Sequence, residues 1–118
     1  MMVDLSHVSH LAMEQALAVS QAPVIFSHSS AFALCSNPRN VPDHILELLP
    51  KKDGIVMVNF YPQFVTCSAN ATLADVADHI DHIGRVAGRD HVGFGSDFDG
   101  IESVPIGLED VTRVSLQI

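Results

Sequence analysis

Two histidines follow apolar runs in positions that suit metal binding. His7 comes just after Met2–Leu5 in MMVDLSHVSH, and His28 lies between two serines at the end of the run in APVIFSHSS. Asp97 and Asp99 follow another such run, in GFGSDFDG. Imidazole and carboxylate groups are common ligands of divalent cations such as zinc. If the runs are neighbouring strands, their polar ends would form one site.

The apolar runs have the β-branched or aromatic composition of buried strands. The segments between them have helical spacing, clearest in Leu73–Ala87, which Thr72 can cap and Gly88 follows. The expected strands are Met2–Leu5, Val24–Phe26, Ile55–Phe60 and Val92–Phe94, and the other expected helices are His10–Ser20 and Pro42–Leu49. Residues 111–118 lack any clear pattern.

Apolar strands that alternate with helices indicate a parallel α/β sheet, either doubly wound or part of a β/α barrel. In both folds the strands end at one edge, about 4.8 Å apart, where ligands bind. We therefore expect His7, His28, Asn59 and Asp97 to converge there. Only one of Asp97 and Asp99 is expected to enter the site.

Other polar residues carry weaker signals. His79 and His82, in ADVADHIDHI, are interpreted as residues of the polar side of the long helix. Arg39, on the loop after His28, could bind a carboxylate through two parallel hydrogen bonds, although a solvated loop charge is the commoner role. The isolated histidines near element ends are assigned no function: His10, His44 and His91.

Composition sets limits on the class of protein. The 118 residues fit one domain, and 47% hydrophobic residues with a mean hydropathy of +0.27 can build a core. A domain of this size leaves much apolar area uncovered, so we expect it to be part of something larger. The net charge of -8, with six Lys and Arg, argues against nucleic-acid binding. No membrane-spanning run and no signal peptide are visible.

Two features depend on the compartment. Cys35 and Cys67 are compatible with one disulfide or with two buried thiols, and counting alone favours the thiols. Asn70-Ala71-Thr72 is an N-glycosylation sequon, which matters only in a secreted protein and often arises by chance.

Seven blocks resemble, in order and spacing, the membrane dipeptidase family (renal dipeptidase), the zinc metallopeptidases of peptidase family M19. They are DLSHVS, APVIFSHSSA, RNVPD, MVNFY, VADHIDHI, VGFGSDFDG and GLEDV, and the likeness runs from about residue 3 to residue 112. The resemblance implies an α/β fold, a partial (β/α)8 TIM-like barrel of the metal-dependent hydrolase type with about four parallel strands. It divides the chain into a partial barrel, 1–112, and a divergent tail, 113–118.

The resemblance also implies an activity, the hydrolysis of dipeptides by a metal-activated hydroxide at a site with two zinc ions. His7 and His28 match the two histidine ligands of one zinc ion. Arg39 matches the arginine that binds the carboxylate of the substrate. Asp97 matches an aspartate near the substrate amine that assists proton transfer.

Further expectations follow from the same resemblance. It implies a Cys35–Cys67 disulfide, which reverses the preference for free thiols and favours an oxidising compartment. Family members are typically homodimeric, GPI-anchored proteins of the cell surface. The family's His-x-Asp ligands, bridging glutamate, further active-site histidine, dimer cysteine and anchor signal are absent from these 118 residues. We therefore expect a fragment that is inactive alone.

Two alternatives stay open. One is a non-catalytic truncated product that acts as a binding or structural fragment through an exposed sheet edge. The other is a different metal-dependent amidohydrolase on the same barrel, against which Arg39 argues because a carboxylate clamp suits a substrate with a free acid.

Overall fold

The computed structural model describes residues 1–117 and contains a four-stranded parallel sheet. The strands are β1 (Val3–Asp4), β2 (Val24–Phe26), β3 (Ile55–Val58) and β4 (Val92–Phe94). They pair in the order β1-β2-β3-β4, with Val3 opposite Val24, Ile25 opposite Ile55 and Val56 opposite Val92. The four expected strands are thus confirmed, with β1 and β3 shorter than expected.

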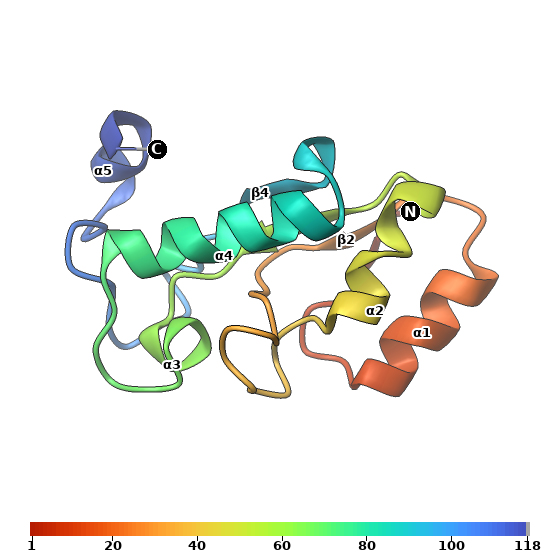
Figure 1. Ribbon diagram of the computed structural model, residues 1–118, viewed down its shortest axis with the longest axis horizontal. Coiled ribbons are helices and arrows are strands. Elements are labelled where there is room, and N and C mark those ends of the chain that lie inside the picture. The colour runs from red at the N-terminus through yellow and green to blue at the C-terminus, as the bar shows by residue number, and fades with distance from the viewer. Residues whose placement is uncertain (118) are drawn as a thin grey trace.

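Helices connect the strands, and a final helix follows β4 (Figure 1). They are α1 (His10–Val19), α2 (Asp43–Leu46), the 3-10 helix η1 (Leu49–Lys52), α3 (Pro62–Val65), α4 (Leu73–Val86), the 3-10 helix η2 (Arg89–His91) and α5 (Val111–Gln117). The expected caps are present. Ser9 Oγ accepts a hydrogen bond from the Ala12 N–H, and Thr72 forms a capping box with Asp75.

The strand order distinguishes a barrel from a doubly wound sheet. Parallel strands are joined almost always by right-handed crossovers. When they also follow one another in sequence order, every crossover helix lies on the same face, as in a β/α barrel. A doubly wound sheet would reverse its order at a switch point. The chain is therefore a partial barrel of about four parallel strands.

The core lies between the sheet and these helices. In β2 and β3 the side chains of Val24, Phe26, Val56 and Val58 are fully buried, whereas the alternating Ile25, Ile55 and Met57 are only partly buried. The helices add further buried side chains on the same side: Met13, Leu17, Ile45, Leu46, Val76 and Ile83. One face of the sheet is thus packed, and the other is partly open.

Three differences from the sequence prediction concern short elements. The helix expected over Pro42–Leu49 is divided into α2 and η1, because Pro50 lies in the next turn and cannot donate a backbone hydrogen bond. The short helices α3 and η2 were not predicted. Residues 111–117 form α5, whose first turn is capped by Asp110 accepting from the Thr112 N–H at 2.8 Å. Ile118, the end of the expected divergent tail, lies outside the described residues.

Cys35 and Cys67 form a disulfide with their Cα atoms 5.4 Å apart. It ties the loop between β2 and α2 to the turn after α3. The pairing implied by the family resemblance is confirmed, and the count-based preference for two thiols was wrong, because the number of cysteines says nothing about which loops the fold brings together.

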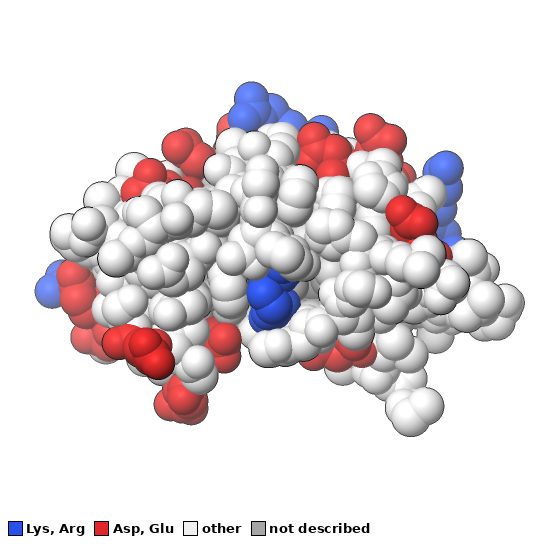
Figure 2. Space-filling model, turned by 90° about the horizontal axis from the view of Figure 1, so that it is seen from below, with Lys and Arg blue, Asp and Glu red and all other residues white. Residues whose placement is uncertain are grey.

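The surface charge and the helix lengths can be compared with the composition of the chain. Figure 2 shows acidic groups at several places around one face and a basic group recessed near its middle. Within residues 1–117, none of the helices combines the length and the apolar character needed to span a membrane.

Candidate functional site

The structure brings the side chains of His7 and His28 together at the carboxyl edge of the sheet. His7 lies three residues beyond the end of β1, and His28 lies two residues beyond the end of β2. Their Nε2 atoms are 2.7 Å apart, and their ring centroids are 4.8 Å apart. Asp97, three residues beyond β4, places Oδ2 at 4.0 Å from His28 Nε2. Three strand ends thus contribute to one small polar site.

The two imidazoles fit a zinc ion. Zinc binds imidazole nitrogen at about 2.0–2.1 Å in tetrahedral geometry, which places two such nitrogens about 3.3 Å apart. The Nε2 atoms of His7 and His28 are 2.7 Å apart and need to separate by only about 0.6 Å to reach that distance. Across the described residues, no three His, Cys, Asp or Glu side chains are grouped closely enough to hold an ion by themselves. The carboxylate of Asp97 lies farther from the two histidines, with Oδ2 at 4.0 Å from His28 Nε2.

The environment of His28 favours its neutral form. Burial lowers the pKa of His28, Asp97 opposes this, and the positive charge of Arg39 lowers the pKa further. Its backbone N–H donates to Ser6 Oγ at 3.0 Å, and Nδ1 lies 2.7 Å from Ser27 Oγ. A neutral imidazole with one nitrogen engaged by the protein has the form that binds metals.

Asp97 is oriented by a buried amide. Asn59, the first residue after β3, is fully buried, and its Nδ2 donates to Asp97 Oδ2 at 3.1 Å. Asn59 Oδ1 accepts from the Tyr61 N–H at 2.6 Å, which fixes the orientation of the amide. Asp99 is exposed in the following turn. Asp97 is therefore the carboxylate of this loop that faces the histidines.

Arg39 lies beside the same site. Its Nη2 donates to the carbonyl oxygen of His28 at 3.3 Å, and its guanidinium carbon stands 5.1 Å from the centre of the Phe64 ring. Burial lowers the pKa of Arg39, with Asp97 and Asp4 acting in the opposite direction. Within the described residues, its buried Nη1 makes no hydrogen bond. An unpaired guanidinium N–H next to the site is a ready donor to an anion.

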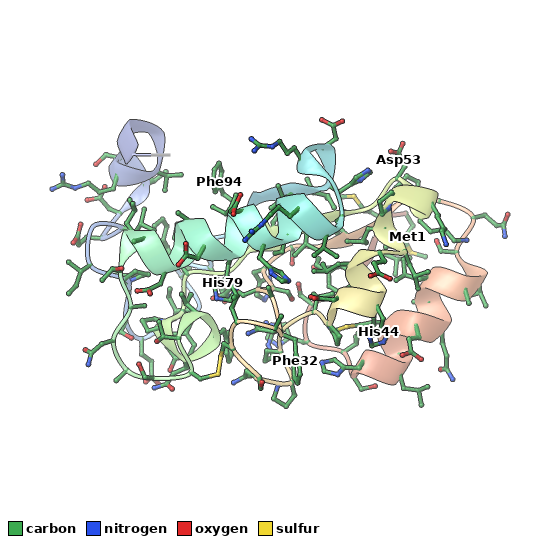
Figure 3. The ribbon with its side chains drawn as sticks, viewed as in Figure 1. Met1, Phe32, His44, Asp53, His79 and Phe94 are labelled. Atoms are coloured by element: carbon green, nitrogen blue, oxygen red, sulfur yellow. A yellow bond between two sulfur atoms is a disulfide. The ribbon has the colours of Figure 1, made fainter. Side chains whose placement is uncertain are left out.

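The interpretation of His79 as a surface residue was wrong. His79 is 1% exposed and lies beneath α4 (Figure 3). Its Nδ1 accepts from the Ala31 N–H at 2.9 Å, and its Nε2 lies 2.8 Å from the Val65 carbonyl oxygen. Burial lowers its pKa, although the hydrogen bond to Val65 opposes this. The ring therefore joins α4 to the loop after β2 and to α3, and it has a structural role.

The remaining histidines make contacts away from His7 and His28. His82, partly buried, pairs with Asp43 at 2.8 Å, and exposed His44 pairs with Glu14 at the same distance. His10 lies 3.0 Å from the Asn40 carbonyl oxygen, and His91 lies 2.7 Å from the Gly54 carbonyl oxygen. These contacts join neighbouring segments.

Asp4 and Ser27 also belong to this site, although the sequence analysis assigned them no role. Ser27 Oγ donates to Asp4 Oδ2 at 2.5 Å and is the neighbour of His28 Nδ1. A signal was available, because each residue lies at the end of its strand, as the histidines do. Only the register of β1 against β2 shows that the two meet.

Comparisons with known proteins identify relatives of this chain. The model of a family described as membrane dipeptidase (peptidase family M19) matches residues 1–117. An uncharacterized dipeptidase of Schizosaccharomyces pombe is 59% identical over 115 residues, which are 96% of this chain and 28% of that protein. Dipeptidase aclJ of Aspergillus oryzae is 52% identical over 115 residues, 96% of this chain and 27% of that protein. The chain thus spans just over a quarter of the length of these curated relatives.

A solved structure has the same fold. The crystal structure of a metallopeptidase from Rhodobacter sphaeroides, liganded with a phosphinate mimic of the dipeptide L-Ala-D-Ala, superposes with a TM-score of 0.87 at 36% identity. The match covers 96% of this chain and 33% of that one. This agrees with the partial barrel described above.

Proposed function

Because the chain belongs to the membrane dipeptidase family, peptidase family M19, we propose that it carries part of the active site of a zinc-dependent dipeptidase. In this proposal His7 and His28 bind one zinc ion. Arg39 binds the carboxylate of a dipeptide, and Asp97 accepts or returns a proton at its amine.

One observation carries the proposal, the 2.7 Å separation of His7 Nε2 and His28 Nε2 at the ends of neighbouring strands. In the absence of an ion, one ring can donate to the other. When both lone pairs face an ion, the same two nitrogens are within about 0.6 Å of the separation that two zinc ligands need. The names of the fungal relatives and the dipeptide mimic in the bacterial structure indicate the same class of substrate.

A bound zinc ion would supply Lewis acidity towards water and the scissile carbonyl. The residues of the chain then define how a dipeptide lies. Arg39 Nη1, which is buried and unpaired among the described residues, would donate to the terminal carboxylate. Asp97, held by Asn59 Nδ2, would receive the charged amine. Contacts at both ends of a dipeptide would place its peptide bond next to the two histidines.

We also propose that the chain by itself hydrolyses dipeptides little or not at all. Catalytic zinc sites usually have three protein ligands, and here two imidazoles converge while Asp97 Oδ2 stays 4.0 Å from His28 Nε2. Zinc-dependent cleavage of L-Ala-D-Ala by the purified 118-residue chain, lost on His28→Ala, would contradict this part of the proposal and leave the dipeptidase assignment intact.

Zinc titration tests the site directly. The chain is titrated with zinc against a chromophoric chelator, together with His7→Ala, His28→Ala and the control His44→Ala, whose imidazole is exposed and pairs with Glu14. We expect one zinc per chain, at least tenfold weaker binding in the first two variants, and no change in the control. Equal affinity in all four proteins would refute the zinc site.

A second candidate function rests on the sheet edge. Within the described residues, β4 pairs on one side only, and next to it α4 and β4 line a groove of about 400 Å³ that includes Ile80, Val92 and the exposed Phe94. An unpaired edge beside an apolar groove suits a further strand and helix of the same kind of barrel. In this reading the chain is a non-catalytic binding fragment. A monomeric chain that melts cooperatively would argue against it.

The setting of the protein is part of the same proposal. We infer a GPI-anchored homodimer at the cell surface from the family membership, and the disulfide agrees with an oxidising compartment. Asn70 is exposed and follows the disulfide turn, so it is accessible to glycosylation. A mass shift of the secreted protein on glycosidase treatment, absent in Asn70→Gln, would test this.

A further inference from the structure

Asp4, the last residue of β1, accepts three hydrogen bonds that fix its carboxylate against the end of β2. Asp4 Oδ1 accepts from the backbone N–H groups of Ser6 at 3.0 Å and Ser27 at 3.1 Å. Asp4 Oδ2 accepts from the Ser27 hydroxyl at 2.5 Å. The two oxygens therefore have distinct partners, with backbone donors on one and a single hydroxyl on the other.

The Ser27 hydroxyl has one proton and three polar neighbours, of which Ser6 Oγ, at 3.4 Å, is the most distant. The two close neighbours compete for the proton. On one side lies Asp4 Oδ2, and on the other lies His28 Nδ1 at 2.7 Å. An ionised carboxylate can only accept, so the hydroxyl proton must be directed to Asp4. The hydroxyl oxygen then has lone pairs free for His28. The contact at 2.7 Å is a hydrogen bond only if Nδ1 carries the proton.

The backbone around His28 fixes the direction of the ring. The His28 N–H donates to Ser6 Oγ at 3.0 Å, and Ser6 Oγ lies 3.3 Å from Ser29 Oγ. Ser6 and Ser29 are buried. The ring is thus held from its backbone and from Nδ1, and its remaining nitrogen, Nε2, faces His7 and Asp97.

We propose that Asp4 is a positioning residue which, through the Ser27 hydroxyl, holds His28 as the Nδ1–H tautomer and so presents the Nε2 lone pair to the metal. This inference rests on the metal-binding role of His28 in the proposed function. Hydrogen bonds to the second nitrogen of a metal-binding histidine set its tautomer and increase its affinity, and their loss typically weakens metal binding about 10–100-fold.

Asp4→Asn provides a sharp test, because it keeps the shape and reverses the direction of the relay. The oxygen of the introduced amide would continue to accept from the Ser6 and Ser27 backbone N–H groups, which places its NH2 group where Asp4 Oδ2 now meets Ser27 Oγ. The amide would donate to the hydroxyl, and the hydroxyl would donate to His28 Nδ1. The proton of the imidazole would then move to Nε2, the nitrogen that should bind zinc.

The tautomer is measured first, by long-range 1H–15N NMR of the metal-free chain at pH 8, above the usual imidazole pKa of about 6.5. We expect a protonated Nδ1 in the wild type, a protonated Nε2 in Asp4→Asn, and a mixture in Ser27→Ala. The control is Asp53→Asn, which removes the same charge from an exposed position before β3, at the opposite end of the sheet. The relay would be overturned if Nδ1 stayed protonated in Asp4→Asn. If Asp4→Asn does not fold, it would be overturned if Nδ1 were protonated in Ser27→Ala as fully as in the wild type.

Zinc titration of the same proteins separates the two proposals. We expect Asp4→Asn to bind zinc about 10–100-fold more weakly than Asp53→Asn. Equal affinities in these two variants would refute the positioning role. A tautomer that reverses as expected in a chain whose wild type binds no zinc would support the relay and contradict the zinc function.

Discussion

Replacing His79 by leucine should strongly destabilise the chain, although its hydrogen bonds are to Ala31 and Val65 and not to His7 or His28. His79→Leu keeps a similar volume and removes both ring nitrogens. The Ala31 N–H and the Val65 carbonyl, bonded to the ring at 2.9 and 2.8 Å, would lose their partner in a site where the ring is 1% exposed. Each buried polar group left unpaired costs about 1–3 kcal/mol, so we expect a loss of about 2–6 kcal/mol.

Urea unfolding followed by circular dichroism at pH 8 measures this loss. His44→Leu is the matched control, because His44 and Glu14 form an exposed pair that should contribute at most about 1 kcal/mol. We expect the urea midpoint of His79→Leu to fall well below that of the control. Equal midpoints would refute the reasoning, since they would mean that water satisfies the Ala31 and Val65 groups.

The buried ring of His79 also makes the stability of the chain depend on pH. Because burial lowers the pKa of His79 below its ordinary value of 6.5, the unfolded chain takes up a proton there before the folded chain does. Stability is therefore retained above pH 6.5 and lost as the pH falls below it, by at most about 1.4 kcal/mol per pH unit. His79→Leu lacks this loss, so the gap between it and the wild type should narrow from about pH 6.5 downwards. A gap that stays constant to about pH 5 would contradict the lowered pKa.

Two further changes test the loops around the site. The Cys35–Cys67 disulfide joins cysteines 32 residues apart, so its reduction should lower the free energy of unfolding by about 3–4 kcal/mol. Urea melts with and without reductant measure this loss, and an unchanged midpoint would show that the thiols do not pair. Gly95→Ala would place a Cβ against the Ser27 carbonyl oxygen and should cost about 1–3 kcal/mol or more in thermal unfolding. Gly84→Ala, whose nearest contact would be 3.7 Å, should instead add about 0.5–1 kcal/mol, so shifts of the same sign would contradict the packing at Gly95.

The elements that the sequence predicted well are those whose signal is local. β2 and β4 have the expected bounds, and α4 ends within one residue of its expected end, because apolar runs and a capped amphipathic stripe are contained in a few consecutive residues. His79 was misread although a signal existed. It lies three residues after Val76 and four before Ile83, both fully buried, so helical spacing already places it on the packed face.

The relay could not be read from the sequence in the same way. Asp4 and Ser27 are 23 residues apart, and their contact depends on β1 pairing with β2 so that Asp4 lies opposite Ile25. A shift of one residue in this register would turn the carboxylate to the other face of the sheet. Pairing register is a property of the folded sheet, whereas the positions of the histidines at strand ends needed only the strand boundaries.

The backbone at the site is also less regular than its sequence suggests. His7 and Asp97 have φ values of 72° and 64°, in the left-handed region that costs a non-glycine residue roughly 1–2 kcal/mol. Both positions are turns beyond strand ends, where a strand conformation would carry the side chain away from its neighbours. At Asp97 the cost is offset by the Gly100 N–H, which donates to its carbonyl at 2.9 Å, and by the Asn59 amide on its carboxylate. His7 and Asp97 thus both reach His28 from turns with strained backbone. Such backbone strain persists only where surrounding contacts stabilise the turn.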